Sequence, residues 1–340
     1  MNISLKRNWY TVRNSGASMN NPTDLQINDQ WIRNHRGAKN RIDPYRPYHF
    51  LIEKERTLDG SIENVITIFL SNKECRFNCL MCDLWKNTID TPVPAGAIPQ
   101  QIEWALEQLP QAKQIKLYNS SNFFDPAAIP TTDYSRIAEL LESFDTVIVE
   151  NHPLLTGERC LQFAGMLHPR LQVAMGLETV HPEVLQRLNK KMKPEDFQRS
   201  VMFLKGHGIG VRTFILLKPP FLSEKEGLHW AKESLIYAFD SGTDCCIVIP
   251  TRAGNGAMDQ LQVEGQFSPP ELISVERIQE YGLNLKRGTV FADTWDLEKF
   301  SRCELCFEKR KERMERMNLT QRIVPGIPCS CHSQAFSCDH

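Results

Sequence analysis

Residues 63–82 read ENVITIFLSNKECRFNCLMC and join an apolar, β-branched run to three closely spaced cysteines. The run ENVITIFLS (Glu63–Ser71) has the composition of a buried strand. Cys75, Cys79 and Cys82 follow it with the spacing C-x3-C-x2-C. Thiolates are soft ligands that suit zinc, copper(I) or iron–sulfur clusters, and three of them leave one coordination position open. The loop therefore predicts a reactive metal centre, and the alternative is a structural zinc site completed by a distant residue.

Further apolar runs follow this first strand, and each stops at polar or proline residues. They are QIKLYNSS (114–121), DTVIVENHP (145–153), LQVAMGLET (171–179), GVRTFILLKPP (210–220) and DCCIVIPTR (244–252). Helical patterns lie between them: QQIEWALEQL (100–109), DYSRIAELLESF (133–144), GERCLQFAGML (157–167), PEDFQRSVMFLKGHG (194–208) and SEKEGLHWAKESLIYAF (223–239). The last of these opens with Ser223 and Glu226 in the spacing of a capping box. This alternation predicts an α/β fold, a partial (β/α)6 barrel over residues 58–285, with functional residues at the carboxyl ends of the strands.

In this context the cysteine loop resembles that of the radical S-adenosylmethionine (radical SAM) superfamily. The resemblance implies that the three thiolates hold a [4Fe–4S] cluster and that S-adenosylmethionine (SAM) chelates its fourth iron. It also implies a reductant protein such as flavodoxin or ferredoxin, and cleavage of the sulfonium to a 5′-deoxyadenosyl radical. The residue before the third cysteine is usually aromatic in this superfamily, whereas here it is Met81, whose flexible thioether can still cover a cofactor edge.

Three longer blocks resemble one branch of this superfamily, which contains the elongator catalytic subunit and the tRNA methylthiotransferases. They are GLETVHPEVLQRLNKKMKPEDF (176–197), LLKPPFLSEKEG (216–227) and GQFSPPELISVERI (265–278). Within the branch, the KPPFL block and the turn NSSNFFDP (119–126) resemble the radical SAM subunits of archaeosine synthases, over about residues 64–278. That resemblance implies a radical that cleaves a lysine adduct on a tRNA base and leaves a formamidine.

The second strand ends in Asn119, Ser120 and Ser121. In the superfamily this place usually holds a glycine-rich turn that hydrogen-bonds the cofactor's amino group, and these three residues offer carbonyl and side-chain acceptors there. The alternative is an ordinary polar loop.

The third and fourth strands end in Glu150 and Glu178, which are the candidate catalytic residues. A carboxylate at this edge accepts hydrogen bonds from ribose hydroxyls or binds a cationic substrate, so Glu178 is also a candidate cofactor ligand, as is Arg212 on the next strand. The alternative for each carboxylate is a structural ion pair with Arg212.

The first 57 residues form the predicted N-terminal basic arm. Residues 1–56 carry ten Lys or Arg against five Asp or Glu, although the whole chain has a formal net charge of −1. Basic and aromatic side chains interleave there: Arg33, Arg36, Lys39, Arg41 and Arg46 with Trp31, Tyr45, Tyr48 and Phe50. Such a segment can follow the phosphates of a tRNA, or it is a solvated arm and the substrate is a small molecule. No membrane span and no signal peptide are evident, so we expect a cytoplasmic protein with neither a membrane nor a DNA partner.

Residues 286–340 form the predicted cysteine-rich C-terminal extension. Cys303 and Cys306, and then Cys329 and Cys331, form C-x2-C and C-x-C pairs on either side of a charged helical stretch. Two close pairs predict a second, four-ligand metal site. It is open whether this site holds structural zinc, an auxiliary iron–sulfur cluster or a soft substrate.

The soft-substrate alternative rests on a resemblance. The radical SAM enzyme of arsinothricin biosynthesis has a similar late Arg-Cys cluster, proposed to hold arsenite during transfer of a 3-amino-3-carboxypropyl group from SAM. Two histidines are also candidate ligands by position, His152 at a strand end and His332 beside Cys331. A rival of another class is a non-catalytic, metal-stabilised RNA-binding module, which predicts closed four-ligand sites only.

Overall fold

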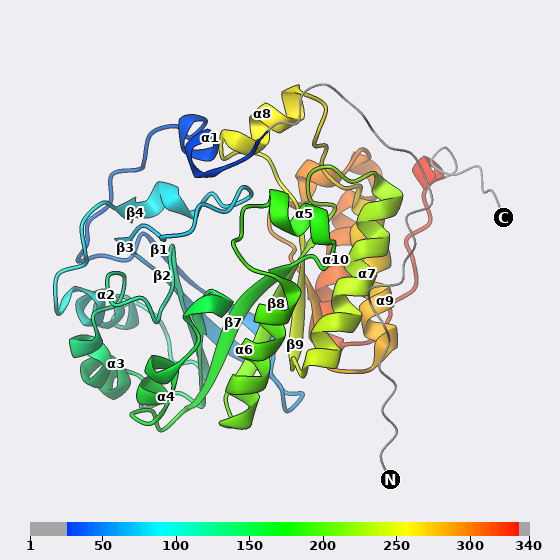
Figure 1. Cartoon of the computed structure of the whole chain (residues 1–340). Helices are drawn as coiled ribbons and strands as arrows, with labels where there is room; N and C mark the ends of the chain where they lie inside the picture. Colours follow the sequence, from blue (N-terminus) through cyan, green and yellow to red (C-terminus); the bar gives the residue numbers. More distant parts are fainter. Residues whose placement is uncertain (1–25, 333–340) are drawn as a thin grey trace, which may run out of the picture.

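The computed structural model describes residues 26–332, and its centre is a curved eight-stranded sheet with the order β1-β2-β5-β6-β7-β8-β9-β10 (Figure 1). Neighbouring strands are parallel except for the antiparallel pair β1–β2. The strands are β1 (His49–Arg56), β2 (Ile62–Leu70), β5 (Gln114–Asn119), β6 (Thr146–Glu150), β7 (Arg170–Glu178), β8 (Gly210–Leu217), β9 (Cys245–Pro250) and β10 (Thr289–Ala292). A small separate sheet pairs β3 (Asn72–Lys73) with β4 (Thr88–Ile89).

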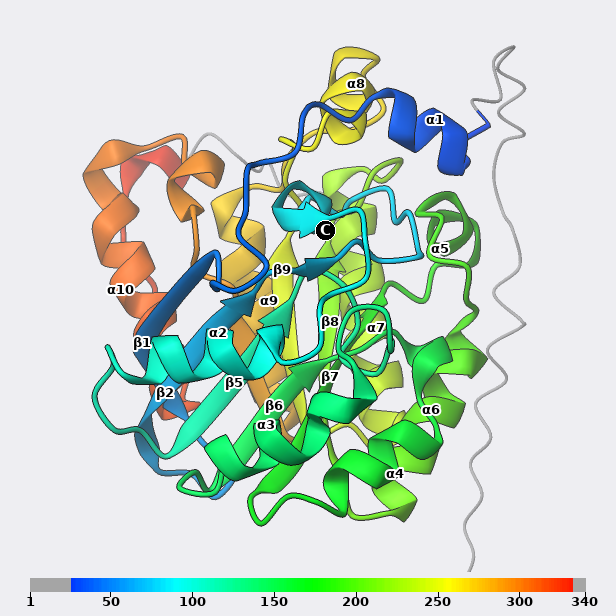
Figure 2. The same ribbon diagram turned by 90° about the vertical axis from the view of Figure 1, so that its left-hand side faces the viewer.

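Helices cover the convex face of the sheet, and shorter helices lie over its carboxyl edge (Figures 1 and 2). The outer helices are α2 (Ala97–Leu106), α3 (Tyr134–Leu140), α4 (Glu158–Ala164), α6 (Pro194–Gly206), α7 (Glu224–Ser241) and α9 (Leu272–Leu285). Over the edge lie α1 (Asp29–Asn34), α5 (Pro182–Arg187) and α8 (Ala257–Val263). The last helix, α10 (Glu304–Thr320), packs against both outermost strands, β1 and β10.

The predicted α/β fold with a partial barrel and a cysteine-rich C-terminal segment is confirmed. Each of the six predicted strands is present, and the predicted capping box of α7 forms, with Ser223 N donating to Glu226 Oε2 at 2.9 Å. Gly242 then ends α7 at a φ of 105°, which glycine adopts without steric cost. The two outermost strands, β1 and β10, were not predicted from the sequence.

The predicted arm of residues 1–57 needs a correction at its C-terminal end. Residues His49–Arg56 form β1, which pairs along its whole length with β2, so the arm ends before His49 within the described residues. The reason is that Phe50 and Ile52 pack against the main hydrophobic core, which holds the segment in the sheet. Residues 1–25 of the arm and 333–340 of the extension lie outside the described residues.

The concave side of the sheet contains a buried layer of ion pairs. Arg212 on β8 lies 2.6 Å from Glu55 on β1, although these strands are not neighbours. Lys116 on β5 lies 2.5 Å from the same carboxylate of Glu55. Contacts between non-adjacent strands are possible only across the concave interior. Within the described residues, no helix is both long enough and apolar enough to cross a membrane.

Candidate functional site at the carboxyl edge of the barrel

The cysteine loop follows β2, and its backbone is held from two sides by hydrogen bonds. Leu80 N donates to Leu188 O at 2.9 Å, and Asn189 Nδ2 donates to Asn78 O at 2.7 Å. From the other side, Asn255 Nδ2 donates to Leu80 O at 2.7 Å. Leu80 itself is fully buried in a second hydrophobic cluster together with residues of α1, α5 and α8. The loop is thus held rigidly at the carboxyl edge of the sheet.

Two N–H donors point at the first thiol of the loop. Phe77 N donates to Cys75 Sγ at 3.4 Å, and Asn122 Nδ2 donates to the same sulfur at 3.1 Å. Asn122 follows β5, and its Oδ1 accepts a hydrogen bond of 2.7 Å from the backbone N of His152, which follows β6. Asn122 therefore joins three strand ends. The predicted site residues end one position before Asn122, at Ser121, although Asn122 lies in the same polar run.

His152 is a packing residue and a hydrogen-bonding residue in this structure. Its ring stacks on Phe77 with 3.9 Å between centroids. Its Nδ1 accepts from Leu154 N at 3.2 Å, so Nε2 carries the proton and donates to Lys190 O at 3.0 Å. Burial lowers the pKa of His152 to about 3, which keeps the ring neutral. Both ring nitrogens are occupied, so the structure does not offer this histidine as a metal ligand.

A buried cation that the sequence analysis did not single out lies beside the loop. Lys190 Nζ is 2.5 Å from Glu178 Oε1, and both side chains are about nine-tenths buried. Burial opposes the charge on Lys190, but Glu178 and then the thiol of Cys79 favour it, and the pKa of Lys190 is raised overall. Burial raises the pKa values of all three loop thiols, that of Cys79 to about 12. A positive charge here therefore favours the thiolate forms that metal binding needs.

Local backbone geometry brings Glu178 into this position. The register between β7 and β8 shifts between Gly176 and Glu178, and Glu178 has a φ of 64°. A Cβ on Gly176 would lie 1.9 Å from Glu178 Oε1 and 2.5 Å from Lys190 Nζ. Any other residue at position 176 would therefore force the charged ends of this pair to shift. Positive φ at a non-glycine residue is strained, and such strain clusters at functional sites.

The predicted residues at the end of β5 face the same region and include polar atoms without a partner among the described residues. Asn119 N donates to Glu150 Oε2 at 3.3 Å, and Ser120 Oγ lies 3.4 Å from the hydroxyl of Tyr48. The side-chain amide of Asn119 and the hydroxyl of Ser121 are buried and make no hydrogen bond within the described protein. Buried polar groups normally have partners, so these atoms suit a polar ligand.

Glu150 and Tyr48 have pKa values that burial shifts strongly. Burial raises the pKa of Glu150 to about 8, since the hydrogen bond from Asn119 N offsets only part of the cost of burying its charge. Burial likewise raises the pKa of Tyr48 to about 12. Tyr48 was predicted to belong to the basic arm; instead its hydroxyl contacts the end of β5. Perturbed carboxyl groups of this kind are typical of functional sites.

The prediction of Arg212 as a cofactor ligand is at odds with its position. Arg212 is the third residue of β8 and lies near the amino end of the sheet, buried between Glu55 and Gln172. Glu150 accepts a hydrogen bond from Asn119, and Glu178 pairs with Lys190. The alternative of an ion pair with Arg212 therefore does not hold for either carboxylate. Met81 is half-buried at the rim of the hydrophobic cluster around Leu80.

The basic residues in and after α1 are mostly engaged with the barrel. Arg36 lies 2.6 Å from Glu74 and over the ring of Trp85, and Lys39 lies 2.6 Å from both Glu74 and Asp90. Arg46 lies over the ring of Trp104. Arg33 and Arg41 are exposed. The segment from Arg33 to Arg46 therefore forms a cover that packs on the carboxyl edge, and only part of the charge of this cover faces solvent.

The four C-terminal cysteines converge. Cys303 Sγ lies 3.7 Å from Cys329 Sγ, and Cys306 Sγ lies 3.7 Å from Cys331 Sγ. All four sulfur atoms lie within 4.8 Å of one another, and all four cysteines are free. The predicted pairing of C-x2-C with C-x-C thus forms one compact group.

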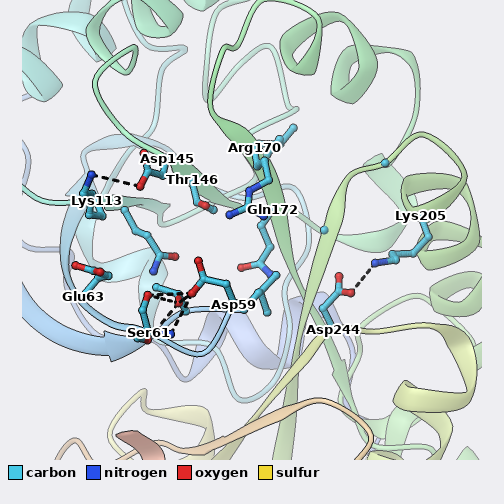
Figure 3. A pocket seen from close by; sticks show the side chains of 16 residues that line it. Asp59, Ser61, Glu63, Lys113, Asp145, Thr146, Arg170, Gln172, Lys205 and Asp244 are labelled. Carbon is cyan, nitrogen blue, oxygen red and sulfur yellow. Dashed lines mark hydrogen bonds and ion pairs between the residues drawn. The ribbon is translucent and has the colours of Figure 1, made fainter.

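A separate polar pocket lies at the opposite, amino end of the strands (Figure 3). Its charged side chains include Lys113 and Asp145, 3.7 Å apart, and Lys205 and Asp244, 2.5 Å apart. It contains none of the predicted site residues, and parallel α/β folds carry their active sites at the other edge. We therefore place the candidate site at the cysteine loop.

No family model matches the chain. Its sequence is 25% identical over 313 residues to "uncharacterized protein MJ0550" of Methanocaldococcus jannaschii. The matched region covers 85% of this chain and 86% of that protein. It is 25% identical over 306 residues to archaeosine synthase subunit beta of Methanosarcina acetivorans (81% and 84% covered). To the Thermococcus kodakarensis subunit of the same name it is 27% identical over 210 residues (59% and 64% covered).

Solved structures with a similar chain path include Elp3 from Methanocaldococcus infernus, with a TM-score of 0.48 and 15% identity over 65% of this chain and 58% of that chain. Methylornithine synthase (PylB) has a TM-score of 0.46 and 15% identity over 74% and 82%.

A partial parallel barrel with a C-x3-C-x2-C loop at its carboxyl edge is the arrangement expected for the radical SAM class. The predicted relationship to archaeosine synthase is confirmed at the level of sequence, because two of the related proteins are named archaeosine synthase subunit beta.

Proposed function

We propose that this chain is a radical SAM enzyme that acts on a base adduct carried by tRNA. The observation that carries the proposal is the convergence at one barrel edge of Cys75, Cys79 and Cys82 with the buried Lys190–Glu178 pair. Soft thiolates of this number and spacing fit a [4Fe–4S] cluster, which binds to cysteine sulfur. When bound, the cluster would supply the electron that cleaves the sulfonium of SAM.

The residues around the loop have separable roles in this proposal. Asn122 and Phe77 N hydrogen-bond Cys75 and fix its orientation. The unpartnered side chains of Asn119 and Ser121 would bind polar groups of SAM. The neutral carboxyl of Glu150 would donate a hydrogen bond at neutral pH, as the direction of its pKa shift indicates.

The substrate proposal rests on the named relatives and on the exposed charge beside the site. Two relatives are named archaeosine synthase subunit beta. Arg33 and Arg41 are exposed on the cover over the barrel edge, where they would meet phosphates of a bound tRNA. The contacts that Arg36 and Lys39 make with Glu74 leave these two less available for that role. A small-molecule substrate is the competing outcome.

The decisive experiment compares wild type with the triple variant Cys75→Ala/Cys79→Ala/Cys82→Ala after anaerobic reconstitution. We expect wild type to bind a [4Fe–4S] cluster and to form 5′-deoxyadenosine from SAM with dithionite, and the variant to do neither. Methylthioadenosine as product would indicate 3-amino-3-carboxypropyl transfer. Zinc alone at this loop in wild type would overturn the proposal and favour a non-catalytic RNA-binding module.

A further inference from the structure

The sulfur positions at the C-terminal site fit one metal ion. The sulfurs of Cys303 and Cys329, and those of Cys306 and Cys331, are 3.7 Å apart. A tetrahedral ion with Zn–S bonds of about 2.3 Å requires S···S distances of about 3.8 Å. A disulfide would need about 2.05 Å. In a [4Fe–4S] cluster each thiolate binds a different iron, and in a [2Fe–2S] cluster two thiolates bind each of two irons. Neither cluster brings all four sulfurs within 4.8 Å of one another, as they are here.

A cation supports this thiolate group from within α10. Arg310 lies one helical turn after Cys306, and its guanidinium interacts electrostatically with the thiol. Arg310 Nε and Nη2 also donate to Glu276 of α9, at 3.0 and 2.5 Å. Four thiolates on a divalent ion leave a net charge of about −2, which an adjacent guanidinium offsets. The Arg310–Glu276 pair, buried on both sides, therefore links the cysteine group to the barrel wall.

The helix between the two cysteine pairs covers the open side of the barrel. Asn318 exchanges hydrogen bonds with the backbone of Ala292 at 2.9 and 2.8 Å, and Gln321 does the same with Val290 at 2.8 and 2.9 Å. These amides replace the strand that would otherwise pair with the free edge of β10. α10 also packs against β1, the other outermost strand (Figure 2). Unpaired strand edges are prone to non-native pairing, so α10 protects these two edges from it.

The chain after α10 folds back to deliver the second cysteine pair. Arg313 Nε donates to Val324 O and to Pro325 O, both at 2.9 Å. This side chain is buried and also lies 3.2 Å from Glu276. Without another interaction, these contacts of Arg313 alone would hold the segment that follows α10 in place.

We propose that Cys303, Cys306, Cys329 and Cys331 bind one zinc ion, and that this ion fastens α10 across the two open edges of the barrel. The site is closed by four protein ligands, as structural zinc sites are. It is independent of the proposed radical chemistry at the other cysteine loop, so either proposal can fail alone.

The test uses protein purified without added iron. We expect one zinc per chain in wild type and in the Cys75→Ala/Cys79→Ala/Cys82→Ala variant, and none in Cys303→Ser/Cys329→Ser. X-ray absorption at the zinc edge should give four sulfur neighbours at about 2.3 Å and no metal neighbour. About four irons in the loop variant, a single iron per chain, or four free thiols titratable with arsenite would each overturn the proposal.

Hydrogen exchange tests the fastening role. Loss of zinc should speed amide exchange in residues 304–331 and in β10 while leaving α4 unchanged. If Cys303→Ser/Cys329→Ser does not fold, wild type stripped of zinc by a chelator provides the same comparison, and added zinc should restore protection. Unchanged exchange in α10 after zinc removal would contradict the fastening role.

Arg310, which links the cysteine group to Glu276, has a matched control on the same helix in Arg316. Arg310→Gln should weaken zinc retention against a competing chelator by about 10–100-fold, the usual effect of losing a residue that supports a ligand. Arg316→Gln, at an exposed position on α10, should retain zinc like wild type. Equal retention in both variants would remove Arg310 from the proposal.

Discussion

Lys190 Nζ lies 2.5 Å from Glu178 Oε1, and this buried pair lies directly beside the cysteine loop. A buried ion pair stabilises a fold weakly, because desolvation of both charges opposes their attraction. Cys79 and Cys75 both favour the charged form of Lys190. The position of the pair beside these two thiols therefore points to a role in setting the charge of the site.

Variants of Lys190, with and without a change at Glu178, should distinguish the effect of this pair on stability from its effect on SAM cleavage. Lys190→Met leaves Glu178 buried without a partner, which should cost about 3–5 kcal/mol of unfolding free energy. The double variant Lys190→Met/Glu178→Gln should recover most of that stability, measured by urea unfolding, but not the formation of 5′-deoxyadenosine. Wild-type SAM cleavage by the double variant would show that the pair is only structural.

Gly176→Ala should disrupt the same pair through sterics. The new Cβ would overlap Glu178 Oε1, so we expect a loss of about 1–3 kcal/mol in stability and a strong fall in SAM cleavage. Gly206→Ala is the matched control, because position 206 is helical and has no neighbouring atom within 4 Å of the added Cβ. It should be neutral or stabilising by about 0.5–1 kcal/mol. Equal effects of the two changes would argue against a special role for Gly176.

Asn122→Leu removes the side-chain hydrogen bond to Cys75 Sγ while keeping the number and branching of the side-chain heavy atoms. Hydrogen bonds to the sulfur ligands stabilise the reduced, more negative state of an iron–sulfur cluster. The variant should therefore have a lower reduction potential, measured by redox titration followed by electron paramagnetic resonance. Asn40→Leu, at an exposed site that bonds Asn87, should leave the potential unchanged. A raised potential in Asn122→Leu would contradict this role.

The buried carboxyl of Glu150 predicts a pH dependence of stability in the absence of SAM. Its pKa rises from 4.5 to about 8 on folding, so the folded state binds the proton more tightly. Its stabilising contribution is complete below about pH 4.5 and is lost as the pH rises through about 8. Glu150→Gln should remove this dependence, so its urea midpoint relative to wild type should increase between pH 6 and pH 9. A constant difference across that range would show that Glu150 is ionised in the fold.

The exposed arginines of the cover test the tRNA proposal. Arg33→Ala/Arg41→Ala should weaken tRNA binding and reduce the slope of log affinity against log salt by about one unit per lost phosphate contact. Lys113→Ala, at the amino end of the strands, is the control and should change neither. If wild type binds no tRNA at low salt, the substrate is a small molecule.

The sequence by itself determined the class of fold and both cysteine groups. Alternating apolar strands and amphipathic helices are local patterns, so the strand beginning at Ile62 and the capping box at Ser223 could be identified without a structure. Cysteine spacing is equally local, and it predicted the loop at Cys75 and the convergence of Cys303 with Cys329.

Only the tertiary structure decided which distant groups meet. Arg212 looks like a strand-end ligand in the sequence, but its place near the amino end of β8 turns it toward Glu55. Lys190 has no local signature, since its role depends on the β7 bulge that presents Glu178. The short strand β10 is stabilised by the side chains of Asn318 and Gln321, which the sequence could not pair with it. The physical reason is the same in each case: burial and hydrogen bonding between remote segments determine a side chain's partner, and neither leaves a periodic trace in the chain.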